Sequence, residues 1–414
     1  MNSPTMKLPA TASHLVETPE QLAHVCQHLL QSQRFAFDTE FIGENTYQPI
    51  LCLVQVATEE RVELIDPMAI GRHGENAMMP LWELLANPDV EKICHAGDQD
   101  VEIVWQHSGL VTANMFDTQI GAGMLGIAYP TALWRAVEHF SGVTLEKAHT
   151  YSAWDRRPLS KSQLAYAVDD VRYLPHIHEL MKKRIGELGH TQWMRAACDE
   201  MCAEAARPGD ARKMFTKIRG APGLDSEQLS VLREVTAMRE QIAYENDLPA
   251  RQVLKDEALL DIATRLPETI EELRAIRDVS ADLAASYGHA MLEAIERGKA
   301  VPEEDRPTIF IPGEDLAEVK RLGETLWVAA QVICLGQSVT PGLVTSQNEV
   351  LALARMVHKK KPLERHALMH GWHAECLGEK LSKFIRGELQ VDVTMIDEEM
   401  RAAFGDVSGG KRNS

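Results

Sequence analysis

The chain has 414 residues, and its 61 Asp and Glu residues against 43 Lys and Arg residues give a formal net charge of -18. With 45% hydrophobic and 25% charged residues, and without an apolar run of about 18 residues, the composition excludes general disorder and a membrane-spanning helix. The length indicates two or three domains. The total charge, taken alone, argues against a nucleic-acid partner.

Cysteine usage and the start of the chain bear on the compartment. Seven cysteines occur at irregular spacing, and the beginning, M-N-S-P-T-M-K-L-P-A-T-A-S-H, lacks the apolar core of a signal peptide. Cys198 and Cys202 stand one helical turn apart, but two sulfurs without a second pair make a poor zinc site. We therefore expect a cytoplasmic protein with reduced thiols and no membrane partner.

The first 190 residues alternate between strand and helix patterns. Short β-rich runs are expected at residues 35–41, 50–57, 62–67 and 91–96. Helical patterns lie between and after these runs, at 80–87, directly after His95, and over 161–188. This alternation predicts an α/β domain that ends near residue 190.

The second half of the chain has a different character. One more helical stretch is followed by a segment rich in Gly, Pro and basic residues, which we interpret as a linker over 201–224. Beyond it the pattern is one of amphipathic helices broken by prolines, with almost no strand signal. These helices predict two small all-α domains, at 225–302 and 313–392, and residues 400–414 are expected to form a disordered tail.

The first predicted strand, F-A-F-D-T-E-F, carries two acids. Side chains alternate along a strand, so Asp38 and Glu40 share one face. Two adjacent carboxylates in a buried sheet are costly unless they are paired or bind a cation. Mg²⁺ meets that need, because it takes oxygen ligands and tolerates a few carboxylates. The alternative is that these acids mark the solvated end of a strand.

Two later segments carry further acids. The run K-I-C-H-A-G-D-Q-D-V-E-I-V passes from a strand into a helix and places Asp98 and Asp100 at the helix start, where helix capping is the alternative role. The run Q-L-A-Y-A-V-D-D-V-R-Y-L places Tyr166 and Asp170 on one helical face. Asp169 points about 100° away, where a solvated face explains it.

Four of these acids suffice for a two-metal site. Asp38, Glu40, Asp100 and Asp170 can hold two divalent ions about 4 Å apart, an arrangement that stabilises the attacking and leaving oxygens in phosphodiester cleavage. The hydroxyl of Tyr166, beside the last acid, can orient the attacking water.

The same three runs resemble a known family. F-D-T-E-F, H-A-G-D-Q-D-V-E-I-V and Y-A-V-D-D-V-R-Y-L look like the three motifs of the DEDDy exonucleases, and most closely like those of the ribonuclease D family. The stretches F-D-T-Q-I-G-A-G-M-L-G, S-G-V-T-L-E-K and W-D-R-R-P-L-S, between the second and third motifs, are also similar to that family. The resemblance implies a ribonuclease H-like exonuclease domain over 1–200, with a mixed sheet flanked by helices.

The resemblance also implies roles for individual residues. The family's catalytic positions fall on Asp38, Glu40, Asp100, Tyr166 and Asp170. Their four acids would bind two divalent metal ions, Mg²⁺ or Mn²⁺, and the tyrosine would position water. The H-A-x-x-x-D and Y-x-x-x-D spacings favour Asp100 over Asp98 and Asp170 over Asp169. Gly43 is a departure, because relatives often carry Arg there, so we expect no phosphate contact from that loop.

Resemblance to a second domain type continues downstream. The run M-R-E-Q-I-A-Y-E-N-D-L-P-A-R-Q-V-L-K-D-E-A-L-L-D-I-A, within about 225–300, is similar to the helicase-and-RNase-D C-terminal (HRDC) domain. A second, more diverged copy is expected over about 315–390, with the same succession of long helix, Pro-containing loop, short helix and closing helix. The resemblance implies two HRDC domains that help to hold RNA.

The function implied is that of a metal-dependent 3′→5′ exoribonuclease. It would remove nucleotides singly from RNA 3′ ends, release nucleoside 5′-monophosphates, and act as a monomer on tRNA precursors and other 3′-tailed RNA. A DNA 3′→5′ exonuclease is the alternative among enzymes, because the same acids serve for either sugar. A catalytically silent RNA-binding protein is the alternative outside enzymes.

No nucleotide cofactor is expected. The run G-A-G-M-L-G at 121–126 has the glycine spacing of a dinucleotide fingerprint, but it is preceded by F-D-T-Q-I and followed closely by Pro130. Close helix packing explains these glycines better. No G-x-x-x-x-G-K-[ST] occurs, which excludes a helicase interpretation of the HRDC resemblance.

Charge is unevenly distributed along the chain. Residues 1–150 carry 7 Lys and Arg against 19 Asp and Glu, a net -12, whereas 355–386 carry 8 basic against 3 acidic residues, a net +5. Residues 205–222 are also basic, with Arg207, Arg212, Lys213, Lys217 and Arg219 against Asp210 alone. Both basic segments predict phosphate-backbone contacts that weaken with salt. For the histidines at 358, 366, 370 and 373, a solvated or phosphate-facing surface is favoured over a metal site.

Overall fold

The computed structural model describes residues 8–11, 14–43, 45–145, 153–206, 211–307, 316–396 and 399–406. The chain forms two compact units. The first comprises residues 1–40, 51–206 and 315–414, and the second comprises 41–50 and 207–314. The C-terminal region therefore clusters with the first half of the chain, while a short loop from the first half clusters with the central helices.

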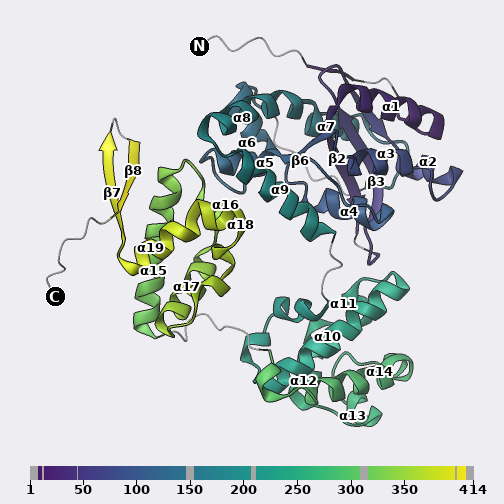
Figure 1. Cartoon of the computed structure of the whole chain (residues 1–414). Helices are drawn as coiled ribbons and strands as arrows, with labels where there is room; N and C mark the ends of the chain where they lie inside the picture. The colour runs from purple at the N-terminus through teal and green to yellow at the C-terminus, as the bar shows by residue number, and fades with distance from the viewer. Residues whose placement is uncertain are drawn as a thin grey trace. The chain divides into compact units, whose positions relative to one another are not determined.

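A six-stranded mixed sheet forms the centre of the first unit (Figure 1). Its order is β1-β4-β3-β2-β5-β6, with bounds Ala10–Thr11 for β1, Arg61–Ile65 for β4, Ile50–Ala57 for β3, Arg34–Ile42 for β2, Glu91–Cys94 for β5 and Met115–Asp117 for β6. Strand β2 runs parallel to β5, and β3 runs antiparallel to β4. All four predicted strands are present, and the predicted α/β fold class with a mixed sheet is confirmed. The two unpredicted strands, β1 and β6, have only two and three residues.

Nine helices of the described chain surround this sheet. They are α1 (Pro19–Ser32), α2 (Pro67–Ile70), α3 (Met79–Ala86), α4 (Asp98–Ser108), α5 (Thr118–Met124), α6 (Leu133–Ser141), α7 (Lys161–Arg172), α8 (Leu174–Leu188) and α9 (Thr191–Ala205). The single helical pattern expected over 161–188 is in fact two helices, with a break at Tyr173. Pro175 explains the break, because a proline is tolerated in the first turn of a helix and not in its interior.

The C-terminal part of the first unit is mainly helical. It contains α15 (Ala317–Gly336), α16 (Pro341–Val344), α17 (Gln347–His358), α18 (Gly371–His373) and α19 (Glu379–Arg386). A hairpin of two antiparallel strands follows, β7 (Leu389–Ile396) and β8 (Glu399–Asp406). The expectation of almost no strand here was wrong, and so was the expected disorder over 400–406. Residues 407–414 lie outside the described residues.

The glycine run at 121–126 packs this C-terminal part against the α/β sheet domain. A Cβ atom at Gly123 would lie 2.8 Å from Leu343 Cδ2 of α16, and one at Gly121 would lie 3.2 Å from the Met181 sulfur of α8, within the sheet domain. The backbone N–H of Thr340 also donates to the Gly123 carbonyl, at 2.8 Å. These contacts support the interpretation that the glycines serve helix packing.

The second unit is a helical bundle. Its helices are α10 (Ser226–Asn246), α11 (Ala250–Val253), α12 (Asp256–Arg265), α13 (Ile270–Arg274) and α14 (Ala281–Lys299). The segment expected to be a linker is part of this unit, because Phe215, Ile218 and Ala221 are buried in its core. The loop that follows β2 also belongs to it: Tyr47 packs against Tyr244, and its hydroxyl donates to Glu240 at 3.2 Å.

Among the described helices, none is both long enough and apolar enough to cross a bilayer.

Candidate active site

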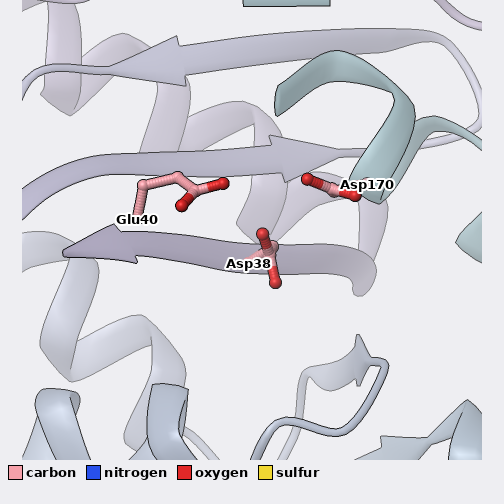
Figure 2. Close-up of side chains that lie close together, drawn as sticks. All are labelled: Asp38, Glu40 and Asp170. Carbon is pink, nitrogen blue, oxygen red and sulfur yellow. The ribbon is translucent and has the colours of Figure 1, made fainter. Parts of the chain in front are cut away.

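Strand β2 presents two carboxylates on one of its faces. Its opposite face carries Phe35 and Phe37, which are fully buried, so the hydrophobic packing of the phenylalanines fixes the direction in which Asp38 and Glu40 project. Carboxylate oxygens of Asp38, Glu40 and Asp170 all lie within 4.8 Å of one another. Figure 2 shows the three side chains together, two from the strand and one from helix α7.

Helix α7 begins at a defined point. Ser160 is its N-cap residue, and Ser160 and Gln163 form a capping box, which fixes the first turn. Tyr166 and Asp170 then fall four residues apart on one face. Tyr166 hydrogen-bonds to the Asp170 carboxylate, so the structure brings the predicted tyrosine and acid into contact.

Asp100 lies in the first turn of α4 and is nearly fully buried. Its Oδ1 accepts a hydrogen bond from the hydroxyl of Thr39 on β2. Asp117 stabilises the start of α4, because its Oδ2 accepts a hydrogen bond from the N–H of the N-cap residue Gly97 at 2.8 Å. Asp100 is thus beside β2, although it is not one of the three acids whose oxygens converge.

The pKa values of these acids are raised, first by burial and then by neighbouring carboxylates. Burial, followed by the charges of Asp170 and Asp100, raises the pKa of Glu40 to about 8. Burial also raises the pKa of Asp170 to about 7 and that of Asp100 to about 6. The pKa of Asp38 is raised as well, by burial first and then by the charges of Asp100, Asp170 and Glu40. A group of acids with such values is unfavourable when fully ionised, unless positive charge is added.

This donor set fits divalent cations. It consists of carboxylate oxygens, which hard ions such as Mg²⁺ and Mn²⁺ prefer. Asp170 Oδ2 is buried and receives no hydrogen bond from any described residue. A buried carboxylate oxygen without a donor is costly, and a bound cation would remove that cost. Asp38, Glu40 and Asp170 are the residues that would hold the ion, with Asp100 adjacent.

The two competing acids are placed differently. Asp169 pairs with Arg172 at 3.2 Å, as a solvated helix face predicts. Asp98 is exposed at the start of α4. Neither belongs to the group of three converging acids. Convergence separates Asp170 from Asp169. Asp100 differs from the exposed Asp98 in being buried and bonded to Thr39.

The other candidate metal groups have structural partners. His366 Nε2 lies 3.0 Å from the Glu349 carbonyl, and His373 Nδ1 lies 3.0 Å from the Val344 carbonyl. Cys198 accepts from the Asp117 N–H, and Cys202 accepts from the Thr112 hydroxyl. Within the described residues, no second group of three or more such ligands converges.

Three residues near the site were not predicted from the sequence: Thr39, Asp117 and Arg157. Each acts through a tertiary contact with a residue at least 20 positions away. Thr39 sits between the two strand acids, and Asp117 and Arg157 lie in the stretches F-D-T-Q and W-D-R-R-P-L. The similarity of those stretches to the family is the signal that could have identified Asp117 and Arg157, but it assigned no role to either.

Two family models match parts of this chain. Residues 13–186 match a family model described as 3′-5′ exonuclease, and residues 228–295 match the HRDC domain. The first match contains all five predicted site residues.

The chain is also similar to curated proteins over most of its length. It is 32% identical to ribonuclease D of Gluconacetobacter diazotrophicus, covering 92% of this chain and 94% of that protein. It is 32% identical to ribonuclease D of Sphingobium indicum, covering 91% and 95%. The crystal structure of Escherichia coli RNase D, described as an exoribonuclease involved in structured RNA processing, matches with a TM-score of 0.76 and 26% identity, over 91% of this chain and 99% of that one. The chain therefore belongs to the ribonuclease D family.

Proposed function

We propose that this protein is a metal-dependent 3′→5′ exoribonuclease that removes nucleotides singly from RNA 3′ ends. The observation that carries the proposal is the convergence of Asp38, Glu40 and Asp170, with one buried carboxylate oxygen left without a donor and Tyr166 bonded to the same acid. Family membership supports the RNA substrate.

The chemistry follows from the positions of these groups. When bound, two divalent ions, Mg²⁺ or Mn²⁺, would lower the pKa of water and stabilise charge on the attacking and leaving oxygens. Asp38, Glu40, Asp100 and Asp170 would hold them. The Tyr166 hydroxyl, beside Asp170, orients the water that attacks the last phosphorus. The new P–O bond forms as the bond to the 3′ oxygen of the preceding nucleotide breaks, so a nucleoside 5′-monophosphate leaves and a new 3′-hydroxyl remains.

In this proposal the two helical regions of the second half of the chain bind the RNA. We take residues 225–302 as an HRDC domain, which the family match supports, and residues 313–392 as a second, diverged copy. Lys359, Lys360, Lys361 and Arg365 are exposed on the loop after α17. A cluster of exposed cations on a chain of net charge -18 is suited to a phosphate backbone.

The wider biology is proposed on the same basis. We place the protein in the cytoplasm, as a monomer without a nucleotide cofactor, with tRNA precursors and other 3′-tailed RNA as substrates. All seven cysteines are free thiols, which supports a reducing compartment.

The test uses RNA labelled at its 5′ end with an unstructured 3′ tail. With Mg²⁺ or Mn²⁺ we expect a ladder that shortens by single nucleotides, and no ladder with EDTA or with Asp38→Asn. Degradation that continues in EDTA, or in the variant, would contradict the metal-dependent mechanism. A DNA strand of matched sequence distinguishes a DNA exonuclease, which would shorten both strands alike. A catalytically silent RNA-binding protein would retain RNA without shortening it.

A further inference from the structure

The segment just before α7 is held by one arginine. This segment, residues 153–159, has the sequence A-W-D-R-R-P-L and leads directly into the helix that carries Tyr166 and Asp170. Within it, the guanidinium of Arg157 faces inward, and the side chain is only 24% exposed. An arginine in such a place makes specific contacts, since its five N–H donors have fixed directions.

The guanidinium contacts three separate parts of the fold. Its Nε donates to Asp66 Oδ2 at 2.5 Å, and its Nη2 donates to the Cys52 carbonyl at 2.7 Å. Its Nη1 donates to the Trp154 carbonyl at 2.7 Å, within its own segment. Cys52 lies in β3, which neighbours the acid-bearing strand β2, and Asp66 directly follows β4. One side chain therefore ties the segment to two neighbouring strands of the sheet.

Asp66, the carboxylate partner of Arg157, is buried and fully hydrogen-bonded. It is 2% exposed, and its Oδ1 accepts from the Ala69 N–H at 3.0 Å, so it also caps α2. Burial alone would raise the pKa of Asp66, but the hydrogen bonds from Arg157 and from the Ala69 N–H bring it below its usual value. A buried, hydrogen-bonded ion pair of this kind fixes geometry, because breaking it leaves a charge without a partner.

The same segment contacts the tyrosine. Trp154 is 2% exposed, and its ring centroid lies 6.2 Å from that of Tyr166, at an interplanar angle of 40°. The Gln163 side chain, in the first turn of α7, donates to the Ala153 carbonyl at 3.3 Å. The segment thus fixes both the start of α7 and the wall beside the Tyr166 ring.

We propose that Arg157 is a positioning residue for the reaction. By tying the segment before α7 to β3 and to Asp66, its guanidinium sets where the Tyr166 hydroxyl stands relative to the acids of β2. It touches neither substrate nor metal in this role. The inference rests on the proposed function, because it assigns a residue that serves the same site.

A direct phosphate contact is the competing role for this arginine. It is disfavoured because Nε, Nη1 and Nη2 already donate to Asp66 and to three carbonyls, those of Cys52, Trp154 and Arg156. The two roles differ in kinetics. Loss of a phosphate contact raises KM, whereas displacement of Tyr166 lowers kcat, since the water is no longer held in line.

The test compares Arg157→Lys with Arg156→Lys in the full-length protein. Arg156 is the adjacent, exposed arginine, so the matched variant keeps the same charge and changes the same side chain. We expect Arg157→Lys to lower kcat by about 10- to 100-fold with KM changed by less than about threefold, because lysine cannot make the three directed contacts. Arg156→Lys should leave both parameters near wild type.

Two further variants keep the result interpretable if Arg157→Lys is poorly folded. Asp66→Asn removes the partner charge while preserving its shape, and it should also lower kcat selectively. Guanidinium chloride at millimolar concentration should restore part of the kcat of Arg157→Ala. It should restore nothing when Tyr166→Phe is combined with Arg157→Ala.

Three kinetic outcomes would overturn the proposal. A raised KM with unchanged kcat in Arg157→Lys would show a phosphate contact. Equal losses in Arg157→Lys and Arg156→Lys would show a general effect of arginine on this surface. Rescue by guanidinium that persists in the double variant would show that Arg157 does not act through Tyr166.

Amide hydrogen exchange separates failure of this proposal from failure of the proposed function. Arg157→Lys should speed exchange in peptides covering residues 161–172, and Arg156→Lys should not. This readout needs no activity. If the wild-type protein shortened no RNA, the function would fail while the exchange result could still stand; unchanged exchange, with activity intact, would reject the positioning role alone.

Discussion

At the scale of single residues, the hydroxyl of Thr39 orients one of the proposed metal-binding acids, although threonine is not itself one of the proposed ligands. Thr39 lies between Asp38 and Glu40 on β2, and its hydroxyl donates to Asp100. Asp100 is buried, so its orientation is set by this bond and by the start of α4. Such outer contacts commonly alter metal affinity by about 10- to 100-fold when they are removed.

Thr39→Val tests this contact. Valine has nearly the same shape but no hydroxyl, so Asp100 loses its side-chain donor, while the bond from the Thr39 backbone N–H and the packing remain. We expect Mn²⁺ binding, measured by calorimetry, to weaken by about tenfold, and Thr39→Ser to bind as the wild type does. Equal affinity in Thr39→Val and wild type would show that the hydroxyl does not orient Asp100.

Tyr166→Phe separates water positioning from metal binding. The hydroxyl is the only group removed, and the four acids remain. We expect kcat to fall by about 100-fold, because the attacking water loses a directing hydrogen bond, while the Mn²⁺ affinity changes little. A large loss of Mn²⁺ affinity in calorimetry would refute the role given to this tyrosine.

The raised pKa values predict how stability depends on pH. Glu40 has a pKa of about 8 in the metal-free folded state against 4.5 as its ordinary value. The folded state therefore binds more protons between these values, and the free energy of unfolding falls as pH rises from about 4.5 to about 8. Cations compete with those protons, so Mn²⁺ should stabilise more at high pH.

Thermal unfolding in EDTA and in Mn²⁺, at about pH 6 and pH 8, checks this prediction. The Tm in EDTA should be lower at the higher pH, and the increase caused by Mn²⁺ should be larger there. Glu40→Gln should reduce both differences, because glutamine does not titrate. An Mn²⁺ effect of equal size at the two pH values would contradict the assignment of ionised acids as ligands.

At the scale of elements, the contact between α5 and α16 connects the α/β sheet domain with the C-terminal helical region. Gly123→Ala places a Cβ atom 2.8 Å from Leu343 Cδ2, closer than side chains pack. We expect urea unfolding to show a loss of about 1–3 kcal/mol, part of which Leu343→Ala should restore in the double variant.

Gly186→Ala is the matched control for this prediction. Gly186 is exposed in α8 and has nothing within 4 Å of its potential Cβ atom. Alanine there should stabilise by about 0.5–1 kcal/mol, because it favours the helix over the unfolded chain. A Gly123→Ala variant as stable as Gly186→Ala would show that α16 does not pack closely at this position.

The elements that sequence patterns predicted are those with strong local signals. The run over 35–41 combined apolar alternation with a family motif, and β2 confirms it. Strands β1 and β6 are too short for any periodicity. The hairpin β7–β8 did carry a signal, since L-Q-V-D-V-T alternates apolar and polar residues, but the helical patterns before it favoured a helical end to the chain.

The site was predictable only in part, for a physical reason. Motif spacing identifies which acids share a strand or helix face, and the structure brings three of the four together. The contacts that orient those acids depend on the tertiary fold: Thr39 meets Asp100 across 61 positions, and Arg157 meets Asp66 across 91. No local pattern specifies such partners.

At the scale of the whole molecule, negative charge is concentrated in the proposed catalytic region and positive charge in a proposed RNA-binding segment. Residues 1–150 carry a net -12, and the acids that converge there are unfavourable together without cations. The segment 355–386 carries a net +5, with Lys359, Lys360 and Lys361 exposed. The net charge of -18 is therefore compatible with an RNA partner.

Salt dependence tests where RNA is held. Replacing Lys359, Lys360 and Lys361 together by Gln removes three cations, which should make the slope of log K against log salt less steep by about 2. Fluorescence anisotropy with labelled RNA in EDTA measures this without cleavage. The control variant, Lys183→Gln with Arg184→Gln on α8, should change the slope little. Equal changes of slope in the two variants would show that RNA does not bind preferentially at the loop after α17.

The source of the oxygen in the product tests the central claim most directly. The wild-type protein is incubated with 3′-tailed RNA and Mn²⁺ in ¹⁸O-labelled water, and the released nucleotide is analysed by mass spectrometry. If Asp38, Glu40, Asp100 and Asp170 support attack by water on the last phosphodiester, the product is a nucleoside 5′-monophosphate with one ¹⁸O on its phosphate, and Asp38→Asn yields none. A 5′-diphosphate, a 3′-monophosphate or an unlabelled 5′-monophosphate would contradict the account.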